Sequence, residues 1–197
     1  MRIFLLFIIL FFSFLSLTKA NDIRDFEIDG ISIGDSLLNL TNKEYIISEI
    51  NTNSKNYSLY FPKDKFGEVY LDSNKEKYST LSFFVKTNDP EYRIYMLRGI
   101  MRFNNNLEKC LKQKTDIIKD LKNIFVNAQS LDNKFASNLD PTGRSFYYNT
   151  SFILDDESRV VVQCSDWEES LRKENNWMSG LSVVLQNKEF IDWMTSN

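Results

Sequence analysis

The sequence predicts an α+β fold, in which a short N-terminal helical hairpin and one long amphipathic helix pack on one face of an antiparallel β-sheet. Three observations lead to this fold class. Apolar residues recur with a helical period through residues 104–128, segments before and after them alternate with period two, and short turns connect those segments. We expect residues 21–197 to form a single domain, because this length suits one core.

The first 20 residues have the pattern of a secretory signal peptide. Arg2 precedes an almost wholly apolar run over Ile3–Leu17, and small residues stand at Thr18 and Ala20, before a cut after Ala20. This run is shorter than the ~20 residues that a membrane-spanning helix needs. We expect a periplasmic or secreted protein with no stable membrane insertion after cleavage; the alternative is an uncleaved N-terminal anchor.

The charge of the exported chain argues against nucleic acid as a partner. Without Arg2 and Lys19, the 24 basic residues fall to 22 against 27 acidic ones, which gives a net charge of −5. The basic residues are spread along the sequence rather than clustered. The partner that we expect is therefore a protein or a small molecule.

Two capping patterns predict the N-terminal helical hairpin. Asp35 or Ser36 can cap a first short helix, whose buried side would carry Leu37, Leu38 and Leu40. Thr41 and Glu44 have the spacing of a capping box, which predicts a second short helix through about Ile50.

Alternation predicts four strands before the long helix: Tyr57–Phe61, Phe66–Leu71, Thr80–Lys86 and Tyr92–Phe103. Gly99 in the last strand marks either a bulge or a close contact with another element. One face of this strand mixes apolar and basic side chains, namely Ile94, Met96, Arg98, Ile100 and Arg102. If the outer face of the sheet is open, this face is the best candidate for a partner surface. The alternatives are a strand covered by loops and a partner that adds to an edge strand.

The long helix is predicted over Asn104–Ala128, where one of three consecutive Asn residues can cap its first turn. Lys114 is the one cation in its apolar stripe. It either serves a pocket as a functional cation, extends its ammonium to the solvent, or pairs with a strand carboxylate. Residues 130–143 are predicted to form a polar connection. The remaining elements are a hairpin, a charged excursion, a strand and a short helix: Arg144–Leu154 with Arg159–Trp167, Glu168–Asn176, Met178–Gln186 and Lys188–Met194.

Two cysteines in an exported chain favour a disulfide. Cys110 lies in the apolar stripe of the long helix, and Cys164 shares a strand face with Val160 and Val162. Both sulfur atoms should therefore point into the interface between helix and sheet. The alternative is a pair of buried free thiols.

The tetrapeptide Gly34–Leu37, GDSL, matches the signature of a hydrolase family in which the serine is the nucleophile. That family uses a histidine as general base, and this chain contains no His. Without a base, the Ser36 hydroxyl is a poor nucleophile, so we expect Ser36 to cap a helix instead. The absence of His also removes Cys–His mechanisms and the usual zinc sites.

Two groups of acidic residues are candidates for a calcium site: Asp155, Asp156 and Glu157, and Asp166, Glu168 and Glu169. They could supply oxygen ligands if their loops met. The plainer interpretation is two solvated loops, and we expect no metal and no cofactor.

The segments Phe26–Leu38 (FEIDGISIGDSLL), Gly99–Cys110 (GIMRFNNNLEKC) and Cys164–Trp167 (CSDW) resemble uncharacterised exported proteins of Pelagibacter-type marine alphaproteobacteria. More distantly, ISIGDS at Ile31–Ser36, followed by two short helices and a meander, resembles the SmpA/BamE and β-lactamase-inhibitor-like fold. That resemblance covers about residues 30–86 and implies a helical hairpin on an antiparallel sheet. The chain lacks the lipidated cysteine of SmpA/BamE.

These observations predict a non-catalytic binding or interaction module of the cell envelope. The first alternative is a hydrolase that uses Ser36, which the lack of His disfavours. The second is an inhibitor of a periplasmic enzyme, which only the distant resemblance in fold implies.

Overall fold

The computed structural model describes residues 22–57, 65–73, 77–103, 105–175, 177 and 179–196, without the side chains of 55–57. The predicted signal peptide, residues 1–20, lies outside the described residues. So does most of the predicted strand Tyr57–Phe61, and Tyr57 itself ends a helix.

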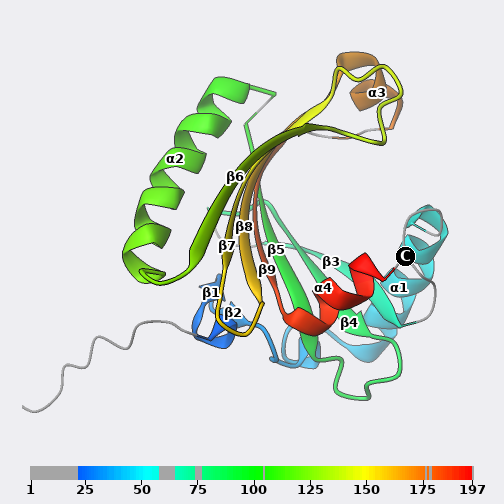
Figure 1. Cartoon of the computed structure of the whole chain (residues 1–197). Coiled ribbons are helices and arrows are strands. Elements are labelled where there is room, and N and C mark those ends of the chain that lie inside the picture. The colour runs from blue at the N-terminus through cyan, green and yellow to red at the C-terminus, as the bar shows by residue number, and fades with distance from the viewer. Residues whose placement is uncertain are drawn as a thin grey trace, which may run out of the picture.

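Seven strands form one twisted antiparallel sheet in the order β3-β4-β5-β9-β8-β7-β6 (Figure 1). Their bounds are β3 Phe66–Asp72, β4 Thr80–Lys86, β5 Ile94–Arg102, β6 Gln129–Ala136, β7 Phe146–Ile153, β8 Arg159–Asp166 and β9 Gly180–Gln186. After β5 the chain passes through helix α2 to β6 at the far edge, and it returns through β7, β8 and β9 to pair with β5. A separate two-stranded sheet joins β1 (Glu27–Ile28) to β2 (Ile31–Ser32).

The helical segments are η1 Ile23–Asp25, η2 Leu37–Asn39, α1 Lys43–Tyr57, α2 Leu107–Ile124, α3 Glu169–Glu174 and α4 Lys188–Thr195. Helices α2 and α4 lie on opposite sides of the large sheet, and α3 lies beyond the ends of its strands (Figure 1). As predicted, an asparagine caps α2: Asn106 accepts a hydrogen bond from the backbone N–H of Lys109. The helix then packs against β8 and β9.

The predicted α+β fold with an N-terminal helical hairpin is wrong, because the fold is mostly β and the first helix of the hairpin is only a 3-10 turn, η2. Ser36 forms a β-bridge with Arg93, and the N–H of Leu37 donates to the carbonyl of Tyr92 at 3.1 Å. These contacts with the chain before β5 hold the backbone extended at Ser36, so no longer helix can begin there. The cap of α1 is Asn42, which accepts from the N–H of Tyr45.

Residues 130–143 were predicted as a polar connection, and this is also wrong for their first half. Strand β6 runs through Gln129–Ala136 and pairs with β7 along its whole length. All of its residues are exposed, so neither face carries the buried apolar series by which strands are recognised in a sequence.

Helix α1 runs along the outer edge of β3 and hydrogen-bonds to its backbone. The hydroxyl of Tyr45 donates to the carbonyl of Tyr70 at 2.9 Å, and the carboxylate of Glu49 accepts from the N–H of Tyr70 at 3.1 Å. The amide of Asn53 donates to the carbonyl of Glu68 at 3.0 Å. Side chains of α1 thus take the place of a neighbouring strand at this edge.

Two apolar cores lie on opposite faces of the sheet. The main core lies beneath α1, α2 and the N-terminal segment, and Leu181, Val183 and Leu185 of β9 point into it as predicted. The smaller core lies beneath α4 and contains Phe66, Phe84, Met96, Val184, Phe190 and Trp193. Helix α4 was predicted from its apolar positions, and the burial of Phe190 and Trp193 confirms it.

Candidate functional site

The predicted partner surface on β5 is divided between the two faces of the sheet. Met96 is buried in the small core beneath α4, whereas Ile94 lies in the main core on the opposite face. The register explains this: Phe84 pairs with Met96 and Val85 pairs with Ile94, so Tyr95 is an extra residue in β5. Such a bulge reverses the alternation, and the placement of Ile94 on the outer face was therefore wrong.

Arg98 of the predicted surface is bonded to a buried acid. Its guanidinium lies 3.0 Å from the carboxylate of Glu68, and it also donates to the hydroxyl of Tyr70 at 3.2 Å. The Glu68 carboxylate accepts a second hydrogen bond, from Ser82. Leaving a buried carboxylate unpaired is strongly unfavourable. Arg98 therefore stabilises the fold by neutralising Glu68. Ile100 is half-buried and Arg102 is exposed; partner binding at this surface stays a prediction.

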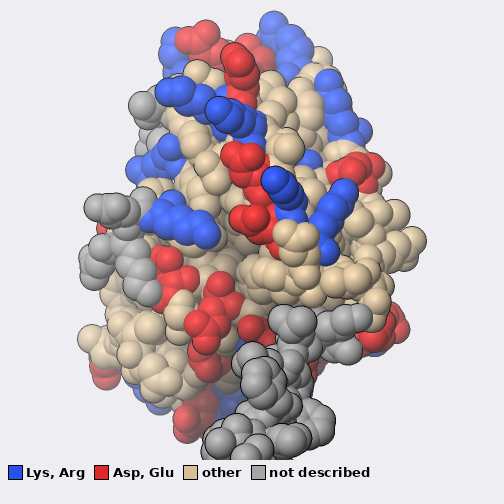
Figure 2. Space-filling view, turned by 90° about the vertical axis from the view of Figure 1, so that its left-hand side faces the viewer, with Lys and Arg blue, Asp and Glu red and all other residues tan. Residues whose placement is uncertain are grey.

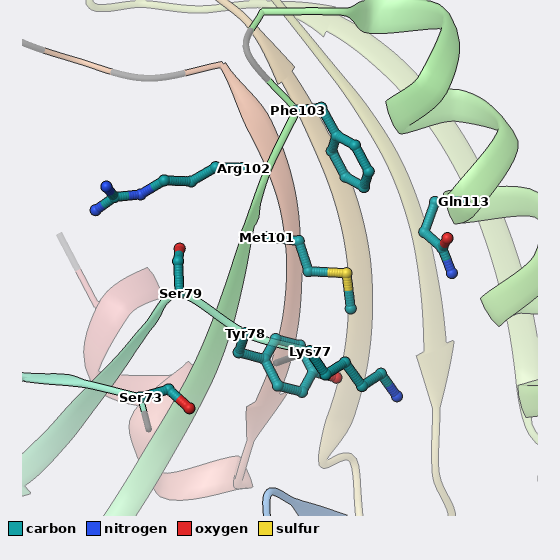
Figure 3. Close-up of a pocket in the computed structure, with 8 residues that line it drawn as sticks. All are labelled: Ser73, Lys77, Tyr78, Ser79, Met101, Arg102, Phe103 and Gln113. Carbon is teal, nitrogen blue, oxygen red and sulfur yellow. The ribbon is translucent and has the colours of Figure 1, made fainter. Parts of the chain in front are cut away.

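A pocket of about 520 Å³ lies on the α2 side of the sheet, at the end of β5. Its walls come from the β3–β4 connection, the end of β5 and helix α2 (Figure 3). The lining residues are Ser73, Lys77, Tyr78, Ser79, Met101, Arg102, Phe103 and Gln113. Sequence reasoning missed this pocket, because its three segments lie far apart in the chain and none carries a recognisable motif.

The floor of the pocket is apolar and closely packed. Tyr78 and Met101 are both buried, and Phe103 is half-buried beside them. A Cβ atom at Gly99 would lie 2.6 Å from the Tyr78 ring, so the glycine makes room for this ring. The prediction of a close contact at Gly99 is thereby confirmed. Burial, with a smaller contribution from the negative charge of Asp29, raises the pKa of Tyr78 to about 12, so its hydroxyl stays protonated at neutral pH.

Three polar side chains that line the pocket, Ser73, Ser79 and Arg102, hydrogen-bond to other groups of the protein. The hydroxyl of Ser79 donates to the carbonyl of Ile100 at 3.0 Å, and that of Ser73 donates to the carboxylate of Asp29 at 2.9 Å. The side chain of Arg102 points away across β5 (Figure 3), where it donates to Thr80.

Lys77 extends on the same side of β5 as Gln113 of α2 (Figure 3), and its ammonium lies 5.4 Å from the centroid of the Tyr78 ring. Lys77 is exposed, and Gln113 is half-buried. The pocket thus presents an ammonium and an amide above an apolar floor.

Ser36 does not have the surroundings of a nucleophile. Its hydroxyl accepts from the N–H of Leu38 at 3.3 Å, which confirms the predicted capping role, and it donates to the carbonyl of Glu91 at 2.6 Å. No histidine exists in the chain to activate it.

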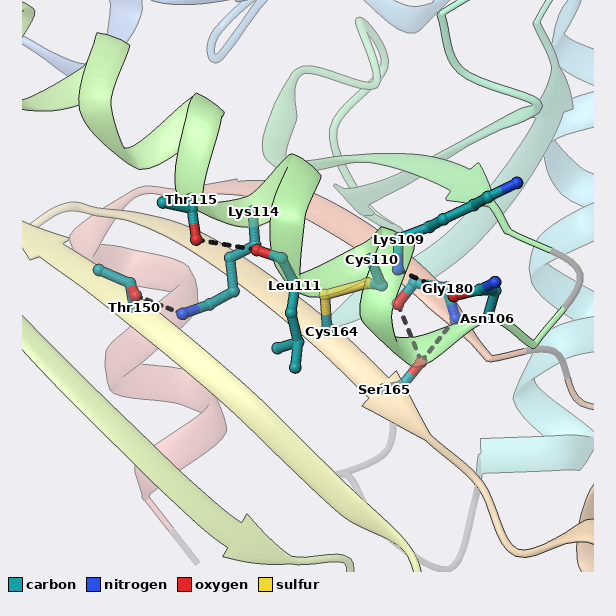
Figure 4. Close-up of a disulfide and its surroundings, with 10 residues drawn as sticks. All are labelled: Asn106, Lys109, Cys110, Leu111, Lys114, Thr115, Thr150, Cys164, Ser165 and Gly180. Carbon is teal, nitrogen blue, oxygen red and sulfur yellow. Dashed lines mark hydrogen bonds between the residues drawn. A yellow bond between two sulfur atoms is a disulfide. The ribbon is translucent and has the colours of Figure 1, made fainter.

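Lys114 and Thr150 have the residue types of a threonine–lysine dyad, but the pair is buried. The ammonium of Lys114 donates to the hydroxyl of Thr150 at 2.6 Å (Figure 4), and this hydroxyl donates to the carboxylate of Asp132. Burial lowers the pKa of Lys114, and the charge of Asp132 opposes this effect. Thr150 has an exposed fraction of 0%, so its hydroxyl is closed to a substrate. The group links α2 to β7 and β6.

Cys110 of α2 and Cys164 of β8 form the predicted disulfide (Figure 4). Both residues are buried, and the structure contains no free cysteine in the part of the chain that it describes. The bond joins the long helix to the strand beneath it, as the parity of Val160, Val162 and Cys164 predicts.

The acidic groups considered for calcium are engaged separately. Glu157 pairs with Lys188 at 3.0 Å, and Glu168 caps α3 by accepting from the N–H groups of Ser170 and Leu171. Among the described residues, no group of three or more His, Cys, Asp or Glu side chains is placed to hold a metal ion. Within the same residues, no helix is long and apolar enough to cross a membrane.

The side of the molecule that carries α2 presents charges of both signs. In Figure 2, the Lys and Arg side chains are interspersed with Asp and Glu side chains on this face. This face therefore offers no single basic patch of the kind that binds a phosphate backbone.

Comparison of the chain with protein-family models, curated proteins and solved structures finds no match.

Proposed function

We propose that this protein is an exported, non-catalytic binding protein whose pocket at the end of β5 takes a small organic anion with an apolar body. The observation that carries this proposal is the pocket of about 520 Å³ with Lys77 at its rim. Pockets for small ligands commonly span ~300–1,000 Å³ and combine apolar walls with a few polar groups. The combination of Met101, Phe103 and Tyr78 with Lys77 and Gln113 fits that description.

The two parts of the pocket contribute differently to binding. Removing apolar ligand surface from water contributes roughly 25 cal/mol per Å², so contact with Met101 and Phe103 supplies most of the affinity. An ion pair with an exposed lysine adds about 0.2–1 kcal/mol. Lys77 therefore selects the sign of the ligand's charge, and a carboxylate or sulfonate is the matching group.

The absence of catalysis is proposed from what the nucleophilic side chains do. Ser36 caps η2, Thr150 is fully buried, and both cysteines are held in a disulfide. Export is proposed from the N-terminal sequence, and a disulfide is typical of an oxidising compartment outside the cytosol.

The test uses two fluorescent probes that share one ring system. Anilinonaphthalene sulfonate carries a negative charge, and N-phenyl-1-naphthylamine lacks the sulfonate. We expect the wild type to bind the sulfonate saturably with one probe per chain. Lys77→Glu should weaken that binding about threefold or more, because up to ~1 kcal/mol of attraction turns into repulsion. Binding of the neutral probe should change little.

Lys119→Glu is the matched control, because it makes the same change of charge at an exposed position of α2 outside the pocket lining. It should leave sulfonate binding unchanged. Since this probe also binds loosely packed states, near-ultraviolet circular dichroism must be the same for all three proteins. Equal sulfonate affinity in wild type and Lys77→Glu would contradict the proposed site.

A further inference from the structure

Strand β6 is an outer edge of the large sheet along its full length. It pairs with β7 over Gln129–Ala136 and has no strand on its other side among the described residues. Alternate backbone N–H and C=O groups of such a strand lie open to another chain. Helix α2 packs on β8 and β9 and leaves this edge uncovered (Figure 1).

The edge is also held in a regular, extended conformation. Its loop to β7 is held by Asp140, whose carboxylate accepts from the backbone N–H groups of Thr142, Arg144 and Ser145. Beyond that loop the β6–β7 pairing runs without a register shift. The backbone of β6 therefore needs little further ordering when a second strand binds. This lowers the entropic cost of association.

The side chains of β6 are complementary to themselves in one antiparallel register. If Asn133 lies opposite Asn133 of a second copy, Asp132 lies opposite the partner's Lys134, and Leu131 lies opposite the partner's Phe135. Antiparallel pairs that face each other lie on the same side of a sheet. The charged pairs then fall on the α2 face, and the apolar pairs fall on the other face.

No other centre within β6 gives this match. A centre at Asp132 or at Lys134 sets that charge against its own copy, which is unfavourable for directly opposed side chains. A centre at Leu131 or at Phe135 leaves Asp132 and Lys134 without oppositely charged partners in the second copy. The Asn133 register also aligns the whole of Ser130–Ala136 with its copy.

The exposed apolar side chains support a second copy as the occupant. Leu131 and Phe135 are 40% and 46% exposed, high values for residues of their size. Both lie on one face of one edge strand, and the Asn133 register covers each with the other. We propose that two copies of this chain associate through antiparallel pairing of their β6 strands, centred on Asn133. This surface is independent of the pocket proposed above.

The first test compares two double variants by sedimentation equilibrium of the exported chain, residues 21–197. Leu131→Lys/Phe135→Lys sets lysine against lysine twice and should give a monomer, with a dimer dissociation constant raised at least tenfold. Leu131→Lys/Phe135→Glu sets lysine against glutamate and should retain the dimer. Both remove the same two apolar side chains, so equal association of the two variants would overturn the proposal. A wild type that is monomeric at roughly 1 mM, a concentration that detects even weak pairing, would also overturn it.

The second test reads the register by cross-linking. In Asn133→Cys, the two new cysteines face each other with Cβ atoms about 5 Å apart, which oxidation can bridge. In Leu131→Cys, the two cysteines lie four residues apart along the strands, or about 13 Å, which a disulfide cannot span. We expect a covalent dimer from Asn133→Cys alone. Cross-linking of both variants, or of neither, would reject this register. Cross-linking of neither is also the result expected if another protein is the natural partner of β6.

Discussion

The two outer strands of the sheet, β3 and β6, differ in whether the chain covers their outer edge. At β3, three side chains of α1 hydrogen-bond to the backbone groups that a neighbouring strand would otherwise take. At β6, every residue is exposed, and no side chain in the described part of the chain hydrogen-bonds to its backbone. An open edge is a hazard that proteins usually cover or charge. The edge at β3 is therefore closed by contacts within the chain. The edge at β6 carries the charges of Asp132 and Lys134, which match those of a second copy in the proposed register.

The two ends of the sheet also differ in how their helices are attached. Both helices pack apolar side chains into the main core. Helix α1 is held on β3 by hydrogen bonds in addition, whereas α2 is held on β8 by the Cys110–Cys164 disulfide in addition. This difference can be tested by loosening each attachment in turn.

The largest effect is expected from loss of the disulfide. Its cysteines are 54 residues apart, and cross-linking a loop of this length stabilises a fold by about 4 kcal/mol in the chain-entropy model. Cys110→Ala/Cys164→Ala should therefore lower the free energy of unfolding by about that amount in urea titrations. A midpoint equal to that of the oxidised wild type would show that α2 needs no covalent attachment.

The second effect concerns the apolar attachment of α1. Ile46 has an exposed fraction of 0%, and truncation of such a residue typically costs about 3 kcal/mol. Ile46→Ala should lower the free energy of unfolding by that amount. Ile47→Ala is the matched control, because Ile47 is 43% exposed and should change stability by less than ~0.5 kcal/mol. Equal losses at both positions would mean that burial of this helix face does not hold α1 on β3.

The features that the sequence predicted are those with a local apolar signal. The stripe of α2, the inward face of β9 and the buried side of α4 all follow from the spacing of their apolar residues. The disulfide followed because Cys110 and Cys164 each share a face with such residues. In every case one side of the element is buried, and burial leaves a periodic pattern in the sequence.

The features that the sequence missed depend on contacts between distant segments or on the lack of burial. Strand β6 has no buried face and therefore no apolar period. The η2 turn replaces a helix because the backbone near Ser36 pairs with residues next to β5. One extra residue, Tyr95, reverses the face on which Ile94 lies. The pocket exists only where three distant segments meet.

A third, smaller effect is expected at the hydrogen bonds that close β3. Asn53 is 8% exposed and donates to the carbonyl of Glu68. Asn53→Ala should lower the free energy of unfolding by about 1–2 kcal/mol, because it leaves a partly buried carbonyl without this donor. Asn51→Ala is the control at an exposed position of the same helix. Hydrogen exchange within β3 should accelerate in Asn53→Ala only; unchanged exchange would show that α1 does not protect this edge.

The smallest effect on the folded monomer is expected at β6, and this prediction separates the two edges most directly. Leu131→Lys/Phe135→Lys changes exposed side chains, so the free energy of unfolding at low protein concentration should change by less than ~0.5 kcal/mol per site. A dimer that forms only from folded chains makes the melting temperature rise with protein concentration. The wild type should show that rise, and the double variant should not. Asn53→Ala should show it as the wild type does, because β3 takes no part in the contact. A wild-type melting temperature that is independent of protein concentration would contradict the dimer. It would mean that β6, like β3, makes no contact with a second copy.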